Sequence, residues 1–528
     1  MEFRGLGPGD LAEALTVLTL GANRGAMARP IRIDLGVAAL VLAVVATAAR
    51  WRVFGNPVVQ IDEQFYLLVG GRMLHGALPY IDIWDRKPIG LFLLYASFRA
   101  LGGSGVLTYQ IAALMSVWAT ALLLFIMARR VAPPAGALVG AILYVLWLNL
   151  AGGEAGQAPV YYNLPVAGAI ALIFFRRRDA ERKQGDLRWP GVGAMLLFGF
   201  AMQIKYSAVF EGVFAGLVLL GISWRAGRPL SRLVLDAALW IGCALAPTLL
   251  AAGAYALMGH FGDWWFANIT SILSRGAEMP GTVARRVVVM IYLMLPLILC
   301  VVFRRWAGAG PEDAEARSDL RFLDAWAGAA LLGVVLFGTW FNHYALPMFA
   351  PFAVVATPLW RHGAGRTWLL VLLVACGIWG QRILWRHAIT RGTAHTLAEA
   401  EAATRGHRGC LFVYDGYPAL YDVTNSCLLT TRPFSAHLQS RNEMGATGID
   451  QVREVHRIMA QRPDRVMTIE PAYDEENLAA RAQIEPVLRS DYRELYRYIG
   501  SSHEFVVYGT KSTVHGPPVI ETADQRFF

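Results

Sequence analysis

Long apolar runs separated by short polar or basic segments fill the chain up to about residue 386. A helix needs about 20 mainly apolar residues to cross the hydrocarbon core of a bilayer. The pattern predicts about eleven transmembrane helices. They lie near Leu35–Ala49, Val106–Met127, Pro134–Leu150, Val160–Phe175, Pro190–Gln203, Ser207–Ser223, Leu233–Met258, Val287–Phe303, Trp326–Trp340, Leu346–Trp360 and Trp368–Leu384.

Beyond residue 386, charges recur every few positions and short apolar stretches alternate with helical patterns, which predicts a water-soluble α/β domain. Its predicted helices are Ala394–Thr404 and Ile449–Gln461, and its predicted strands are Cys410–Tyr414, Val466–Ile469 and Phe505–Tyr508. The expected organisation is a leader (1–30), a transmembrane domain (31–385, first outer loop 51–104) and the C-terminal domain (386–528).

Composition agrees with a membrane protein, because 55% of the 528 residues are hydrophobic and only 16% are charged. The net charge of +9 does not indicate nucleic-acid binding, since Arg and Lys cluster in short loops between the apolar runs. Cytoplasmic loops of membrane proteins carry this excess of positive charge. The basic segments are Arg29–Arg32, Arg129–Arg130, Arg176–Arg178, Trp224–Arg232, Arg304–Arg305 and Arg361–Arg366.

The apolar run Ile89–Leu101 decides the topology. It is short for a span, so we interpret it as an interfacial or re-entrant helix. All basic loops then fall on the cytoplasmic side with the N-terminus, and the C-terminal domain lies outside, in a periplasm-like or extracellular space. The Ala- and Arg-rich composition favours the inner membrane of a bacterium.

Polar residues that took no part in this assignment fall together on the outer side. They are Asp62-Glu63, Asp85-Arg86-Lys87, Glu154, Asn163, Lys205, Asp263 and His343-Tyr344. Ionisable residues near a membrane mark cavities or functional sites. A carboxylate there can act as general base toward a hydroxyl or amine, and cations can offset charge on a phosphate leaving group. Paired carboxylates also suit a divalent cation, although two acids are too few to require one, and no metal-ligand spacing is present.

The first outer loop resembles that of type C glycosyltransferases, in the branch of protein O-mannosyltransferases and the lipid A aminoarabinose transferase. Four elements match in order: Asp62-Glu63-x-x-Tyr66, Gly70-Gly71, Pro79-Tyr80 and Asp85-Arg86-Lys87-Pro88. The family's second proline is Ile89 here. Asn163-Leu-Pro165, with Glu154 upstream, occupies the place of an acidic residue of the second outer loop, and His343-Tyr344-x-Leu346-Pro347 resembles a late aromatic-Leu-Pro segment.

The resemblance implies a type C fold and an inverting transfer of a sugar from a polyprenyl-phosphate donor to a glycan, lipid or protein of the cell envelope, among membrane lipids. It implies Asp62 as base with Glu63 as its partner. The donor phosphate would contact Lys87 and Arg86, with Lys205 or His343 assisting. Expected substrate contacts are Tyr66, Tyr80, Asp85, Glu154, Asn163 and Tyr344.

Two alternatives stay open. A transporter or flippase for lipid-linked glycans would also place ionisable residues in a membrane, but it predicts inverted repeats, and we find none. A non-catalytic scaffold would use the polar face to bind a partner. The pairing of Cys410 and Cys427 is equally open, because an exported domain could join them in a disulfide or leave both free.

Overall fold

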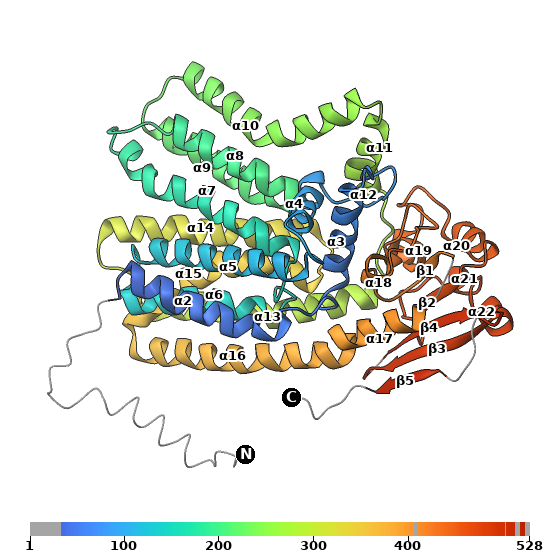
Figure 1. Ribbon diagram of the computed structural model, residues 1–528. Coiled ribbons are helices and arrows are strands. Elements are labelled where there is room, and N and C mark those ends of the chain that lie inside the picture. The colour runs from blue at the N-terminus through green and yellow to red at the C-terminus, as the bar shows by residue number, and fades with distance from the viewer. Residues whose placement is uncertain (1–32, 406–408, 502, 513–517, 523–528) are drawn as a thin grey trace, which may run out of the picture.

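The computed structural model describes residues 33–405, 409–501, 503–512 and 518–522. The expected leader (1–30) lies outside them. Figure 1 shows a bundle of long helices with a smaller α/β domain at one of its ends.

Eight helices in the described part of the chain are long and apolar enough to cross a membrane. They contain α2 (Leu35–Arg50), α5 (Val106–Ala128), α7 (Ala158–Glu181), α9 (Val209–Arg225), α10 (Leu230–Leu257), α13 (Pro280–Trp306), α14 (Ala314–Phe337) and α16 (Gly363–Arg391). The other three predicted spans are also helical but shorter: α6 (Pro134–Leu148), α8 (Arg188–Ile204) and α15 (Leu346–Ala356). The chain is a polytopic α-helical membrane protein.

Apolar side chains on the outside of the bundle agree with a lipid environment. On α10, Leu249 and Leu250 are 62% and 74% exposed. A helix that is apolar on all sides is stable only when protein or lipid surrounds it.

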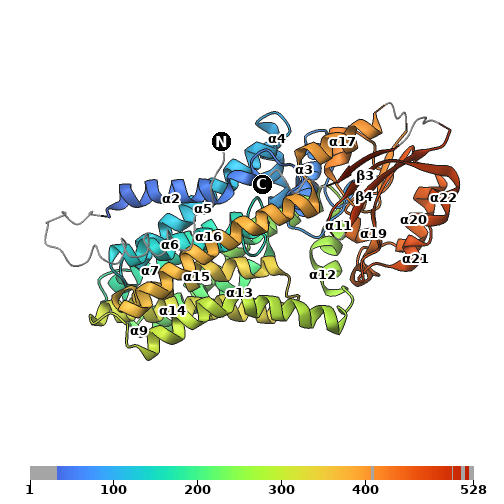
Figure 2. The same cartoon turned by 90° about the horizontal axis from the view of Figure 1, so that it is seen from below.

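The loops that carry basic segments, such as Arg129–Arg130 and Arg361–Arg366, lie at the end of the bundle far from the α/β domain (Figure 2). There Arg361 donates to the carbonyl of Val131, and Arg177 and Arg178 both bind Asp319. This arrangement agrees with the expected division of the loops into two sides.

The opposite end is built from short helices. In the first outer loop, α3 (Ile61–Met73) packs against α4 (Ile89–Ala100), which is the expected interfacial helix. A second outer segment follows α10 and contains α11 (Phe261–Trp265), one π-helical turn (Phe266–Thr270) and α12 (Ser271–Leu273).

The C-terminal domain is a five-stranded mixed sheet with helices packed around it. Its strands are β1 (Leu411–Val413), β2 (Arg465–Glu470), β3 (Tyr492–Ile499), β4 (Glu504–Thr510) and β5 (Val519–Thr522), in the order β1-β2-β4-β3-β5. Its helices are α17 (Ala394–Thr404), α18 (Ala419–Val423), α19 (Ser435–Gln439), α20 (Gln451–Ala460), α21 (Leu478–Arg481) and α22 (Glu485–Asp491).

All five predicted elements of this domain are present, but β3 and β5 were not predicted. Strand β3 carries polar residues on its half-exposed face, where Arg497 pairs with Glu470 of β2 and Glu504 of β4. Such cross-strand partners stabilise a strand that has little apolar pattern of its own.

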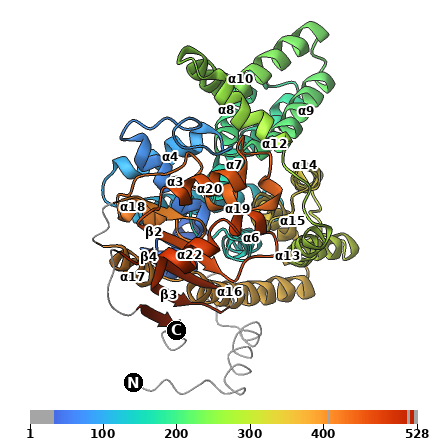
Figure 3. The ribbon, with the colours of Figure 1, turned by 90° about the vertical axis from the view of Figure 1, so that its right-hand side faces the viewer.

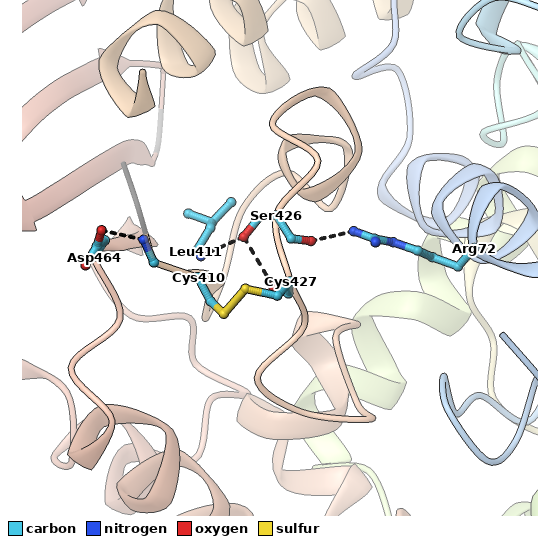
Figure 4. The surroundings of a disulfide bond; sticks show 7 residues. Arg72, Cys410, Leu411, Ser426, Cys427 and Asp464 are labelled. Carbon is cyan, nitrogen blue, oxygen red and sulfur yellow. Dashed lines mark hydrogen bonds between the residues drawn. A yellow bond between two sulfur atoms is a disulfide. The ribbon is translucent and has the colours of Figure 1, made fainter. Parts of the chain in front are cut away.

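The C-terminal domain lies over the outer loops of the bundle (Figure 3). A disulfide joins Cys410 to Cys427, and the adjacent Ser426 carbonyl accepts a hydrogen bond from Arg72 of α3 (Figure 4). A second contact is the ion pair of Arg99 and Asp422, at 3.0 Å. The domain is therefore attached directly to α3 and α4, the two helices of the first outer loop.

Candidate active site

Asp62 lies in the first turn of α3, within reach of the charges of two lysines. Gln157 Nε2 donates a hydrogen bond to its Oδ2 at 2.8 Å. Burial alone would raise the pKa of Asp62, but the charge of Lys87, the bond from Gln157 and the charge of Lys205 together hold it below its ordinary value. Asp62 is therefore a carboxylate at neutral pH, which is the form that a general base requires.

Lys87 occupies the segment between α3 and α4. Its backbone N–H donates to Asp85 Oδ1 at 2.8 Å, and its Nζ lies 3.9 Å from the same oxygen and 5.6 Å from the ring centre of Tyr66. Burial lowers the pKa of Lys87, but Asp85, Tyr66 and Asp62 raise it above the ordinary value. The side chain is 27% exposed, so the permanent charge of Lys87 is accessible to a ligand.

Lys205 lies between α8 and α9, with its Nζ 3.8 Å from the ring centre of Tyr344. Burial and repulsion from Lys87 lower the pKa of Lys205 to about 7, although Asp62 opposes the shift. A cation over an aromatic face keeps its donors available to a ligand. Lys205 can therefore join Lys87 in binding one anion.

His343 stacks on Phe341 at 5.7 Å and lies 4.7 Å from Tyr344, both measured between ring centres. Burial and the charge of Lys205 lower the pKa of His343 to about 3, against the opposing effect of Asp62. The imidazole is therefore neutral, so it can supply a hydrogen bond to a phosphate but no positive charge.

Glu63 contacts a different set of residues from Asp62. It is completely buried, and Tyr109 Oη donates to its Oε2 at 3.0 Å. Burial and the neighbouring Glu154 raise the pKa of Glu63 well above its ordinary value. A protonated carboxyl in this position supports the packing around α3 and offers Asp62 no second negative charge.

Arg86 is paired with the C-terminal domain. Its Nη1 donates to Glu443 Oε1 at 2.7 Å, its Nη2 binds Oε2, and its Nε lies 3.2 Å from Ser271 Oγ. With both guanidinium arms on one carboxylate, Arg86 is not free to hold a donor phosphate in this conformation. Asp85 is also directed toward that domain, with its Oδ2 3.7 Å from His437 Nε2.

Three of the other expected contacts are held by protein atoms. Glu154 accepts from Gln60 at 2.7 Å and lies 3.0 Å from His387 Nδ1. Burial opposes its ionisation, but His387 and Arg391 lower the pKa of Glu154 to about 2. Asn163 donates to Tyr144 and to the Leu346 carbonyl, both at 3.3 Å. Tyr80 Oη donates to the Lys87 carbonyl at 2.8 Å.

Sequence reasoning missed the partners of these groups. Tyr109, His387 and Glu443 come from α5, α16 and the C-terminal domain, and no motif pointed to them. For a divalent cation, the described residues contain no group of three or more His, Cys, Asp or Glu side chains that could hold one. The site is thus one carboxylate facing two lysines, beside aromatic rings.

Comparisons with known proteins give a fold and no close relative. The chain matches no protein-family model. It also matches no curated protein.

Solved structures are similar over most of the chain. ArnT from Cupriavidus metallidurans bound to undecaprenyl phosphate has a TM-score of 0.58 at 13% identity, covering 92% of this chain and all of that chain. The apo state of the same protein has a TM-score of 0.56 at 13% identity, over 91% of this chain and 99% of that one. The apo Archaeoglobus fulgidus oligosaccharyltransferase has a TM-score of 0.50 at 10% identity, over 88% and 80%. Such coverage at low identity shows a shared fold.

Proposed function

We propose that this chain, which has the fold of the type C glycosyltransferases, is a membrane glycosyltransferase that uses a polyprenyl-phosphate-linked sugar. The observation that carries the proposal is Asp62, an ionised carboxylate close enough to Lys87 and Lys205 for their charges to lower its pKa. A general base beside two phosphate-binding cations is what attack on a glycosyl phosphate requires.

The proposed reaction is a single displacement. An acceptor hydroxyl or amine gives its proton to Asp62 while its oxygen or nitrogen bonds to the anomeric carbon. The bond between that carbon and the phosphate oxygen breaks on the opposite face, so the configuration inverts and polyprenyl phosphate leaves. Lys87 offsets the charge that develops on the phosphate, with Lys205 and a hydrogen bond from His343 assisting.

The nature of the donor follows from the fold neighbour and the charge of the site. ArnT, whose fold this chain shares, has been solved with undecaprenyl phosphate bound. Two lysines whose charges act on Asp62 suit a phosphate, and the apolar surface of the bundle suits a polyprenyl tail. Tyr66 and Tyr344, the rings beneath the two lysines, border the place proposed for the phosphate.

We place the site on the outer face of a bacterial inner membrane, with the N-terminus in the cytoplasm and the C-terminal domain in the periplasm. The basic loops at the far end of the bundle support this orientation through the positive-inside rule. The acceptor would then be a glycan, lipid or protein of the cell envelope.

Transfer by the purified protein in lipid nanodiscs tests the proposal. The donor is a synthetic polyprenyl-phosphate sugar with a radiolabelled sugar, offered with envelope glycans, lipids and proteins as acceptors. Loss of a general base costs roughly 10²–10⁴-fold, so Asp62→Asn should lower the transfer rate by about that factor. Asp263→Asn is the control, because Asp263 is exposed and pairs with His260 outside the site.

Equal rates for Asp62→Asn and wild type would refute the assigned site. If labelled lipid instead changed leaflet with no new glycosidic bond, the protein would be a transporter. A scaffold would do neither.

A further inference from the structure

The C-terminal domain holds the segment that carries Lys87. Within Trp84-Asp85-Arg86-Lys87, each of the first three residues contacts that domain. The Trp84 backbone N–H donates to the Thr431 carbonyl at 2.8 Å, and its ring centre lies 4.8 Å from that of His437. Lys87 itself is joined to the set through Asp85, which accepts from its backbone N–H.

Glu443 is the centre of these contacts. Its side chain is only 5% exposed and binds Arg86 through both carboxylate oxygens. Arg275, from the segment after α12, lies 3.1 Å from the same carboxylate. One buried acid thus joins the first outer loop, the second outer segment and the C-terminal domain.

The surrounding charges stabilise the contact between Glu443 and Arg86. Burial would raise the pKa of Glu443, but Arg86 and Arg275 lower it below its ordinary value. An arginine with both arms on one carboxylate is fixed in orientation as well as in distance. Arg86 and Lys87 are adjacent, so a fixed position of the Arg86 side chain also restricts the backbone position of Lys87.

We propose that the C-terminal domain acts as a clamp on the Trp84–Lys87 segment, and that Glu443 is the positioning residue that sets Lys87 against the donor phosphate. This rests on the proposed function, because it explains how Lys87 reaches its place. Glu443 touches no reacting atom and acts through Arg86.

The expected effect is large for a remote residue, because displacing a catalytic group by about 1 Å can cost roughly 10²-fold in rate. Glu443→Gln keeps the size of the side chain and removes the charge that binds both arms of Arg86. We expect kcat/KM for the donor to fall by about 10- to 100-fold. The kcat/KM of Arg86→Gln should fall by a similar factor.

The double variant Glu443→Gln/Arg86→Gln separates positioning from general damage. If Glu443 acts through Arg86, the double variant should be no worse than either single one, since the interaction is lost only once. Asp422→Asn is the matched control, because Asp422 also joins this domain to the bundle, through Arg99 of α4. It should leave kcat/KM within about twofold of wild type, because its partner Arg99 lies near the end of α4, away from the Trp84–Lys87 segment.

Two measurements need no transfer activity, so they separate failure of the clamp from failure of the proposed function. The first is the rate at which an amine-reactive acylating reagent modifies Lys87, followed by mass spectrometry. It should rise in Glu443→Gln and stay unchanged in Asp422→Asn. The second is binding of undecaprenyl phosphate, which should weaken in Glu443→Gln.

Four results would overturn the inference. They are wild-type kcat/KM in Glu443→Gln, losses that multiply in the double variant, an equal loss in Asp422→Asn, or tighter binding of undecaprenyl phosphate to Glu443→Gln. The last would mean that Glu443 shields positive charge rather than positions it. If only the transfer assay is silent while acylation and binding respond as expected, the clamp stands and the transferase assignment falls.

Discussion

At the scale of single residues, Asp62 and the two lysines differ in how far their pKa values lie from neutral pH. Asp62 is ionised and Lys87 is a permanent cation, whereas burial and Lys87 bring the pKa of Lys205 to about 7. Lys205 is therefore the group of the three whose charge changes within the physiological range of pH.

This difference predicts a pH dependence of phosphate binding. Lys205 loses its proton as pH rises through about 7, so its contribution to binding undecaprenyl phosphate is present below that pH and lost above it. A charged hydrogen bond is worth about 1.5–3 kcal/mol, which corresponds to roughly 10- to 100-fold in affinity. Titration of binding between pH 6 and 9 measures it.

Variants isolate the effect from titration of the phosphate itself, whose second pKa is about 6. Lys205→Arg stays protonated and should remove the decline at high pH. Lys205→Met should bind weakly throughout the range. A wild-type pH profile that parallels the Lys205→Met profile would contradict a role for the Lys205 charge.

Sequence reasoning at this scale was strongest for the side chains that lie near Asp62. Asp62, Lys87, Lys205 and His343 were expected on one side of the membrane, and the structure brings them together. Glu63 and Arg86 belong to the same motif, yet their contacts are with Tyr109 and Glu443. Motif spacing does not reveal a partner that is remote in sequence.

At the scale of elements, α3 and α4 position the site because each begins beside a functional residue. Asp62 is the second residue of α3, and Lys87 lies two positions before α4. The helices touch at Gly70, where an added Cβ would lie 2.6 Å from the backbone nitrogen of Ala96. That close approach gives Gly70 a structural reason.

The two adjacent glycines form a matched pair of variants. A Cβ at Gly70 meets backbone, which cannot yield, whereas a Cβ at Gly71 would lie 3.2 Å from the flexible side chain of Arg99. Gly70→Ala should therefore destabilise the protein by about 1–3 kcal/mol, the usual cost of overpacking, and slow transfer by moving α3 against α4. Gly71→Ala should change the stability and the transfer rate much less.

Thermal unfolding in detergent and the transfer rate in nanodiscs provide the comparison. Equal melting temperatures for Gly70→Ala and Gly71→Ala would show that the two helices separate at little cost. The contact would then have no part in placing Asp62.

At the scale of the whole molecule, the chain separates a basic end from a polar, domain-covered end. The arrangement predicts that Asn342 and Arg453 face one side of the membrane and Arg305 the other. Arg453 and Arg305 have side chains 87% and 69% exposed, and Asn342 is also exposed, so each tolerates a reporter cysteine.

The measurement is labelling with a membrane-impermeant maleimide on spheroplasts, in which the inner membrane stays intact. Cys243, Cys300 and Cys376 are replaced in the background, and the other two cysteines are joined to each other. Asn342→Cys and Arg453→Cys should label at once, and Arg305→Cys only after permeabilisation. Labelling of Asn342→Cys and Arg305→Cys from the same side would refute the topology.

The sequence by itself determined the membrane character, the approximate spans, the grouping of basic loops and the residues that carry charge at the site. These follow from local composition, since burial in lipid and the sign of a loop depend on short stretches of chain. The α/β nature of the tail followed from its periodicity in the same way, whereas the strand Tyr492–Ile499 depended on neighbours that pattern alone does not identify.

Tertiary structure decided which of these charges are available. Glu443 lies more than 350 positions from Arg86 along the chain yet binds both of its guanidinium arms. Burial and Glu154 raise the pKa of Glu63 against the hydrogen bond from Tyr109, and burial and Lys87 lower the pKa of Lys205. A charge in a low-dielectric site depends on every group within a few ångströms, and folding determines that neighbourhood.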